Sequence, residues 1–206
     1  MKEYHKIVTV LARDPNTKFR TLTENWACTE FKYLSQNEWI WTEKIDGTNV
    51  RIGWEDGKVL IRGKTDNAQL HISLIEYLQS KIYAGVLERV FSAANAYIYG
   101  EGYGVKIQNG GGYLPDGVSF ITYDININGI WLERRNVEGI ANSLELDIVP
   151  IVDIGTLTDA ISLCKNGFAS NIGSRQAEGL VMRPSTELLD RKGGRIITKI
   201  KYKDFK

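Results

Sequence analysis

From residue 43 to residue 49 the chain reads Glu43-Lys44-Ile45-Asp46-Gly47-Thr48-Asn49, and its other short motifs follow this stretch in one order. Residues 39–41 just before it are expected to form a strand, so the lysine would stand where a strand enters an Asp-Gly turn. A lysine in that position suits a covalent nucleophile, provided that its amine is neutral. Neighbouring cations, a metal ion or desolvation favour the neutral form. For this string alone, a surface lysine beside a turn is the better explanation.

Five further motifs follow along the chain. They are Arg62-Gly63-Lys64-Thr65, Tyr99-Gly100-Glu101-Gly102, Phe120-Ile121-Thr122-Tyr123-Asp124, Glu178-Gly179-Leu180-Val181-Met182-Arg183 and Lys199-Ile200-Lys201. Each is weak alone, but the ordered set resembles the covalent nucleotidyltransferases, which comprise ATP-dependent ligases and mRNA capping enzymes. The chain is most similar to ATP-dependent RNA ligases, especially the nick-sealing RNA ligases of T-even phages. The resemblance runs from about residue 41 to residue 205, and it departs from the phage motif at Asp46, where that motif has histidine.

The resemblance implies an α+β fold: an ATP-grasp-like nucleotidyltransferase domain for ligase adenylylation, with mostly antiparallel sheets and flanking helices. It implies a single domain over residues 1–206, with residues 1–38 as an N-terminal arm and no C-terminal accessory domain. The residue pattern agrees, because segments of alternating polarity outnumber segments of helical spacing. We expect strands at residues 39–41, 49–54, 58–62, 96–99, 119–127, 130–132, 179–183 and 195–202, helices at residues 73–91, 136–146 and 158–165, and a flexible loop near the substrate at Gly110-Gly111-Gly112.

The resemblance also implies which residues carry the chemistry. Lys44 would attack the α-phosphorus of ATP, release pyrophosphate and form a lysyl–AMP phosphoramidate. Lys199 and Lys201 would share one face of a strand and stabilise charge on the phosphates, although a solvated strand face is the ordinary explanation for such a pair. These three lysines are the expected catalytic residues. Asp46 and Glu178 are the expected ligands of Mg²⁺ or Mn²⁺, since such ions prefer oxygen ligands.

Contacts to the nucleoside are implied in the same way. Glu101, between two glycines, would accept hydrogen bonds from the ribose hydroxyls. Phe120 would stack on the purine, although an isolated phenylalanine in a strand is more often a core residue. Arg62 is slightly favoured over Lys64 as the cation near the phosphate or ribose, and both stay open. The expected nucleotide-binding residues are Glu43, Lys44, Asp46, Gly47, Asn49, Arg62, Lys64, Glu101, Phe120, Glu178, Lys199 and Lys201.

Composition narrows the class of protein further. With 43% hydrophobic residues, 25% charged residues and a net charge of +1, the chain reads as a soluble globular protein with no global bias toward nucleic acid. No apolar run approaches the length of a membrane span. Cys28 and Cys164 are interpreted as free thiols in a reducing compartment. Together with the resemblance, this implies the cytoplasm of a bacterium or of a phage-infected host cell. His5 and His71 are too few for a zinc site or a histidine-based triad.

The sequence therefore predicts an ATP-dependent RNA ligase that joins 5′-phosphate and 3′-hydroxyl ends through lysyl–AMP and an AMP-capped polynucleotide. Its expected partners are RNA ends or a nicked duplex, without a membrane, and it is expected to act as a monomer. Two alternatives stay open: a DNA ligase or mRNA-capping-type nucleotidyltransferase, and a noncatalytic RNA-end-binding module. Against the module stands the joint presence of five residues of the motifs: Lys44, Glu101, Glu178, Lys199 and Lys201.

Overall fold

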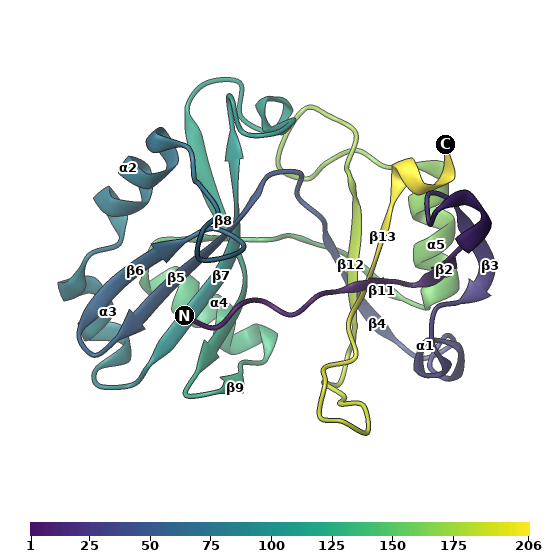
Figure 1. Cartoon of the computed structure of the whole chain (residues 1–206), viewed down its shortest axis with the longest axis horizontal. Coiled ribbons are helices and arrows are strands. Elements are labelled where there is room, and N and C mark those ends of the chain that lie inside the picture. Colours follow the sequence, from purple (N-terminus) through teal and green to yellow (C-terminus); the bar gives the residue numbers. More distant parts are fainter. The chain divides into compact units, whose positions relative to one another are not determined.

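The computed structural model describes residues 1–206, except for the burial of Gly111. The chain folds into two compact units, which are described separately below (Figure 1). Unit 1 comprises Met1–His5 and Asp46–Val149, and unit 2 comprises Lys6–Ile45 and Pro150–Lys206. Lys44 and Asp46, only two residues apart in the sequence, therefore belong to different units.

Unit 1 is built on a six-stranded sheet. Its strands lie in the order β10 (Asp147–Ile148), β8 (Val118–Ile127), β7 (Ala96–Gly104), β5 (Thr48–Glu55) and β6 (Lys58–Arg62), with β9 (Ile130–Trp131) also paired to β8. Strands β10 and β8 run parallel, and the other pairs are antiparallel. The turn from β5 to β6 has positive φ at Asp56 (49°) and Gly57 (72°), as in the two-residue hairpin turn that an Asp-Gly sequence predicts.

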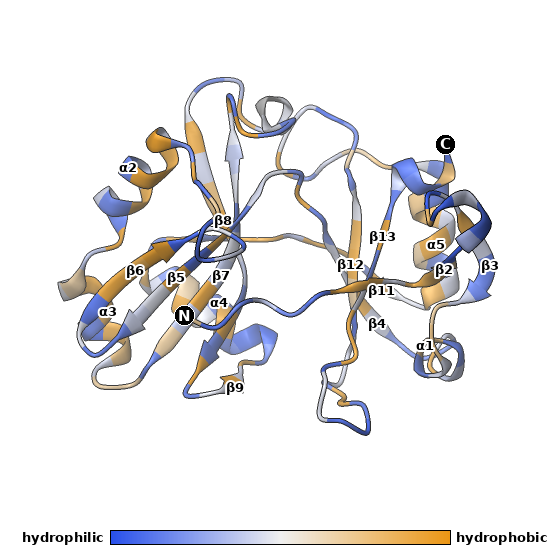
Figure 2. Ribbon diagram, viewed as in Figure 1, coloured by the Kyte–Doolittle hydropathy of each residue, from blue (hydrophilic) through white to orange (hydrophobic). Residues whose placement is uncertain are grey.

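One face of this sheet, called the core face below, is covered by helices. It carries Val50 and Ile52 on β5 and Ile98 on β7, and these side chains are at most 1% exposed. They pack in one apolar cluster with residues of α2 (Ile72–Lys81), α3 (Ala84–Phe91) and α4 (Arg134–Ser143). Helix α2 shows both apolar and polar residues in Figure 2, as expected for a helix that is buried on one side only.

The opposite face of the sheet, called the polar face below, carries Asn49 and Arg51 on β5 opposite Glu101 and Tyr99 on β7. The first residues of the chain lie against this face. The Tyr4 ring lies 5.1 Å from the Tyr99 ring, and the Tyr99 hydroxyl donates to the carbonyl of residue 2 at 3.2 Å. Charged and aromatic residues thus line a face that the helices leave uncovered.

The single helix expected at residues 73–91 is wrong, because the structure breaks it into α2 and α3. Ile82 ends α2 in an extended conformation (φ −112°, ψ 103°), and Tyr83 is extended before α3 begins. The apolar spacing continues across the break because Ile82 is itself a core residue, 2% exposed. Ile82, Tyr83 and Gly85 are all poorer helix formers than alanine or leucine, which favours a break at this point.

Unit 2 contains a second sheet, mostly antiparallel, with the order β1 (Val8–Thr9), β13 (Thr198–Lys201), β12 (Gly179–Pro184), β4 (Trp39–Glu43) and β11 (Ile151–Gly155). Only the pairing of β1 with β13 is parallel in this five-stranded sheet. A separate hairpin joins β2 (Leu11–Arg13) to β3 (Leu22–Trp26). Helices α1 (Thr29–Tyr33) and α5 (Leu157–Asn166) contribute Phe31, Leu157 and Ala160 to an apolar core with Trp39 and Leu180.

These features confirm the expected α+β fold with mostly antiparallel sheets. The expected N-terminal arm contains strands β1 to β3 and helix α1, none of which the sequence predicted. The predicted strand at residues 195–202 is shorter, at Thr198–Lys201, and a short 3-10 helix follows it at Tyr202–Phe205. Two other 3-10 helices lie at Pro15–Thr17 and Gly110–Gly112. Among the described residues, no helix is long and apolar enough to cross a membrane.

Candidate active site

Lys44 follows strand β4 directly, and β4 lies between β12 and the edge strand β11 in the unit 2 sheet. Its backbone N–H donates to the carbonyl of Gly179 at 2.9 Å, which extends the pairing of β4 with β12 by one residue. Its Nζ donates to Glu178 Oε2 at 2.6 Å, and its side chain is 20% exposed. The Lys44 side chain is therefore held in one direction rather than left mobile on the surface.

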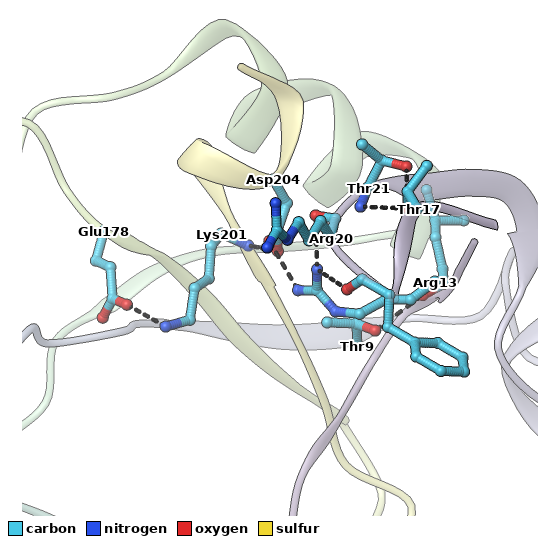
Figure 3. Close-up of polar contacts among 10 residues, drawn as sticks. Thr9, Arg13, Thr17, Arg20, Thr21, Glu178, Lys201 and Asp204 are labelled. Atoms are coloured by element: carbon cyan, nitrogen blue, oxygen red, sulfur yellow. Dashed lines mark hydrogen bonds and ion pairs between the residues drawn. The ribbon is translucent and has the colours of Figure 1, made fainter. Parts of the chain in front are cut away.

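Glu178 accepts from a second lysine through its other oxygen. Lys201, at the end of β13, places its Nζ 2.5 Å from Glu178 Oε1, as Figure 3 shows. The Glu178 side chain is 10% exposed, so both pairs are only partly screened by water. Two ammonium groups around one carboxylate leave a net positive charge, and such a group of side chains attracts phosphate.

Residues from the N-terminal hairpin and the last turn of the chain support Lys201. The Lys201 backbone N–H donates to Asp204 Oδ2 at 3.2 Å, and the Arg13 guanidinium donates to Asp204 Oδ1 at 2.7 Å (Figure 3). Arg13 also donates to the carbonyls of Phe19 and Arg20, at 3.4 Å and 3.3 Å. Sequence reasoning missed Arg13 and Asp204, because their pairing spans almost the whole chain and leaves no local pattern.

The other expected residues of unit 2 are placed as follows. Lys199 lies in β13 two residues before Lys201, so both lie on the same face of that strand, as predicted. Glu43 is 1% exposed, and the Asn171 backbone N–H donates to its Oε2 at 2.8 Å. In this conformation the Glu43 carboxylate accepts a hydrogen bond from the loop that follows α5.

In unit 1, the polar face brings Asn49 and Glu101 directly opposite each other across β5 and β7. The Asn49 amide donates to the Tyr123 hydroxyl, and the Asn49 carbonyl oxygen is buried with no hydrogen-bond partner among the described residues. Desolvation, followed by the Glu101 carboxylate, raises the pKa of Tyr123 well above its ordinary value. Asn49, Glu101 and Tyr123 thus form one group on one face.

The structure does not bring Phe120 to that group. Phe120 pairs with Gly102, whereas its neighbour Ile121 pairs with Glu101, so Phe120 points to the core face. It is fully buried in the helix-covered cluster, and an added Cβ on Gly100 would lie 2.2 Å from its ring. Phe120 therefore packs as a core residue, which was the ordinary explanation for it. In this conformation its ring offers no exposed face to a base.

Tyr123 is an aromatic residue of the polar face that sequence reasoning missed as a site residue. The pairing of β7 with β8 is irregular here, because Gly100 pairs with Thr122 and Tyr99 pairs with Asp124. Tyr123 is the extra residue of a β-bulge, a feature that often redirects a side chain. The available signal was its position inside the quoted motif, one residue before Asp124.

Asp46 and Gly47 lead into β5. The Asp46 N–H donates to the Tyr113 hydroxyl at 3.0 Å, and Asn109 Nδ2 donates to Asp46 Oδ2 at 3.1 Å. Gly47 approaches β7 so closely that an added Cβ would lie 2.2 Å from the carbonyl oxygen of Gly102. The close neighbour of Gly47 in the structure is therefore a protein strand.

Both candidate cations near the end of β6 are exposed. Arg62 pairs with Arg51 and so belongs to the polar face, and it donates to the carbonyl of Ile61 at 3.0 Å. Lys64 follows in a loop that buried Arg51 anchors, because Arg51 donates to Gly63 O at 2.7 Å and to Asp66 Oδ1 at 2.8 Å. The polar face favours Arg62, and Lys64 stays a candidate.

The oxygen ligands expected for a divalent ion fit an ion that arrives with phosphates. No cluster of three or more His, Cys, Asp or Glu residues able to hold a metal occurs among the described residues. Mg²⁺ commonly uses one or two carboxylates, several waters and substrate phosphates, so a preformed cage is not needed. Glu178 offers a carboxylate for this purpose in unit 2 and Asp46 offers one in unit 1, each with hydrogen-bonded support.

The chain and its fold are similar to known proteins of one family. A family model described as RNA ligase matches residues 37–202. Three similar solved structures are mutants of Naegleria gruberi RNA ligase. The apo mutant has a TM-score of 0.69 and 14% identity, and the match covers 98% of this chain and 62% of that chain. The mutant with AMP and Mn has a TM-score of 0.69 and 15% identity (98% of this chain, 56% of that chain), and the mutant with ATP and Mn has a TM-score of 0.68 and 14% identity (97% of this chain, 60% of that chain). This chain thus spans about six-tenths of the length of those ligases. No curated protein sequence matches it significantly.

Proposed function

This chain belongs to the RNA ligase family, and we propose that it is an ATP-dependent RNA ligase that joins 5′-phosphate and 3′-hydroxyl ends through a covalent lysyl–AMP intermediate. The observation that carries the proposal is the pairing of Lys44 and Lys201 with the two oxygens of Glu178. Similar ligases were solved with ATP or AMP and Mn, which supports the same nucleotide and a divalent ion here.

In the first step Lys44 leaves Glu178 and gives up a proton to water, and its neutral amine attacks the α-phosphorus of ATP. An N–P bond forms, the bond from that phosphorus to the bridging oxygen breaks, pyrophosphate departs, and the nitrogen gives up a second proton to water. Lys199 and Lys201 offset the negative charge that gathers on the phosphates. Glu178 in unit 2 and Asp46 in unit 1 are each a candidate ligand of Mg²⁺ or Mn²⁺, which when bound would orient the phosphates and neutralise their charge.

The two later steps transfer and then release AMP. An oxygen of the RNA 5′-phosphate attacks the phosphorus of lysyl–AMP, which forms AMP-capped RNA and returns the Lys44 amine. The 3′-hydroxyl of the other end then attacks the 5′-phosphorus, a phosphodiester bond forms, and AMP leaves. Every bond that breaks is a phosphoanhydride or phosphoramidate bond, so ATP is the only source of energy that the reaction needs.

Residues on the polar face of unit 1 make the contacts with the nucleoside. The Glu101 carboxylate accepts hydrogen bonds from ribose hydroxyls, and the unpaired Asn49 carbonyl oxygen accepts one more. Tyr123, half-buried on the face that carries Glu101, is the aromatic side chain available to the base, whereas Phe120 and Tyr99 are fully buried. Stacking on an aromatic ring accommodates any flat base.

The proposal is tested by incubating the protein with α-labelled ATP and Mg²⁺, denaturing it and measuring the label that stays on the chain. Wild type should be labelled, and Lys44→Ala should not. Lys32→Ala, which removes an exposed lysine from α1, should label like wild type. Label on Lys44→Ala would contradict the assignment of the nucleophile.

Two further comparisons narrow the activity. Labelling with ATP but not with GTP would separate a ligase from a capping enzyme. Faster sealing of nicks that carry RNA than of all-DNA nicks would separate an RNA ligase from a DNA ligase. The likeness to the phage nick-sealing group stays a prediction, and a panel of nicked duplexes, single strands and broken hairpins tests it. Binding of RNA ends without any labelling would instead favour the noncatalytic module.

A further inference from the structure

The loop between β7 and β8 contacts Asp46, although the reaction steps above assign the loop no role. This loop, residues 105–117, contains Gly110-Gly111-Gly112, which the sequence suggested would be a flexible segment near the substrate. Two of its side chains reach Asp46: Asn109 Nδ2 donates to the carboxylate at 3.1 Å, and the Tyr113 hydroxyl accepts from the Asp46 N–H at 3.0 Å. The loop therefore contacts Asp46 through both its side chain and its backbone.

The loop itself is anchored to the end of β7. Gly110 lies so close to this strand that an added Cβ would be 2.7 Å from the backbone nitrogen of Gly104. The Tyr113 N–H donates to Gly110 O at 3.0 Å. The Tyr113 ring is 5% exposed and packs edge-on against the Tyr103 ring, with centroids 5.8 Å apart. These contacts give the Tyr113 hydroxyl a fixed position from which to hold Asp46.

We propose that Asn109 and Tyr113 are positioning residues that hold Asp46 for its contact with the divalent ion that enters with ATP. This inference rests on the function proposed above. A carboxylate has about four acceptor sites, so the Asn109 amide can orient it and still leave oxygen lone pairs for a hydrated ion. The bond from the Asp46 N–H to Tyr113 fixes the backbone two residues after the nucleophile. The predicted consequence is a weaker response to the metal, rather than slower chemistry, when either residue is altered.

The first experiment measures lysyl–AMP formation at saturating ATP across a series of Mn²⁺ concentrations. Asn109→Ala and Tyr113→Phe should each raise the half-saturating Mn²⁺ concentration about fivefold to tenfold, the effect of losing one hydrogen bond to a charged or structural partner. The rate at saturating Mn²⁺ should change less than twofold. The matched controls are Asn37→Ala and Tyr33→Phe, which remove the same groups from exposed positions in unit 2 and should leave the curve unchanged.

A second measurement avoids turnover altogether. The electron paramagnetic resonance signal of free Mn²⁺, recorded with α,β-methylene-ATP present, reports how much Mn²⁺ the protein binds. Asn109→Ala should weaken this binding by the same factor, while its thermal unfolding midpoint stays close to that of wild type, because Asn109 is exposed. If Tyr113→Phe fails to fold, Asn109→Ala alone decides the question.

A mutant cycle shows whether Asn109 acts through Asp46. In an Asp46→Ala background, adding Asn109→Ala should cause no further loss of Mn²⁺ binding. Equal losses in both backgrounds, or an unchanged Mn²⁺ response in the single variants, would overturn the proposal. If wild type binds Mn²⁺ and α,β-methylene-ATP but never becomes labelled by ATP, the proposed ligase function fails, whereas the positioning proposal is still decided by the binding data.

Discussion

Replacing Gly47 with alanine tests how tightly the start of β5 is packed against β7. The added Cβ would lie 2.2 Å from Gly102 O, 2.9 Å from Glu101 Cγ and 3.1 Å from Gly102 C, whereas ordinary contact begins at 3.4 Å. Two of these three atoms belong to the backbone of a central strand, so they cannot move aside like the end of a flexible side chain. Gly47 is not among the glycines with positive φ, so the clash alone produces the effect.

The expected cost lies at the upper end of that for overpacking, about 3 kcal/mol. For a chain of this size, that corresponds to a fall of about 6–12 °C in the unfolding midpoint. Because Glu101 must also shift, the ATP concentration at half-maximal labelling should rise about tenfold, the equivalent of roughly 1.4 kcal/mol. Calorimetry and urea unfolding give the first quantity, and labelling with α-labelled ATP gives the second.

Gly139→Ala is the matched control, since Gly139 lies within α4 and an added Cβ would have nothing within 4 Å. It should stabilise the protein by about 0.5–1 kcal/mol, because alanine is the better helix former. If Gly47→Ala unfolds within about 0.5 kcal/mol of wild type, the small change expected for an ordinary surface substitution, the close approach of β5 to β7 is not a constraint.

Two further predictions concern titration. The hydrogen bond from Arg51 lowers the pKa of Asp66, so the stability contributed by this pair is present above the ordinary carboxyl pKa of about 3.9 and is lost as pH falls through the lowered pKa. Asp66→Asn should therefore destabilise the protein to urea more at pH 7 than at pH 3, and an equal loss at both would contradict this. The hydrogen bond to Glu55, then burial, raises the pKa of Tyr97 to about 12, so the contribution of this hydrogen bond to stability is complete below pH 10 and is lost near pH 12. The difference in ultraviolet absorbance between wild type and Tyr97→Phe should therefore titrate near pH 12. A transition near pH 10 would refute the raised pKa.

Local patterns predicted the elements whose causes are local. The hairpin of β5 and β6 follows from polar alternation on both sides of an Asp-Gly turn, and that turn has the expected positive φ values. The helix from residue 73 to residue 91 failed because apolar spacing records which residues face the core and not whether the backbone stays helical between them. Ile82 satisfies the spacing while it is extended.

Long-range pairs could not be predicted in the same way. Glu178 meets a lysine 134 positions earlier in the chain, and Arg13 meets Asp204 across 191 positions. The resemblance to a family predicted separate roles for Lys44, the nucleophile, and Glu178, a metal ligand. Only the sheet order, with β4 beside β12 and β12 beside β13, explains why their side chains touch. The residues that support the pair, which have no motif of their own, appear only once that order is known.

The bulge in β8 shows where strand periodicity misleads. In a regular strand, residues 120, 122 and 124 would share one face, and Tyr123 would share the other with Ile121. The structure keeps Phe120 and Thr122 on the core face, yet Asp124 pairs with Tyr99 on the polar face, because one extra residue enters β8 at the bulge. Tyr123 and Asp124 both contact polar-face partners as a result, through Asn49 and Tyr4 respectively. The bulge thus changes the face of Asp124, whereas Phe120 and Tyr123 lie on opposite faces with or without it. Deleting one residue to remove the bulge should therefore cost the hydrogen bond from the Tyr4 hydroxyl to Asp124 even if the sheet refolds.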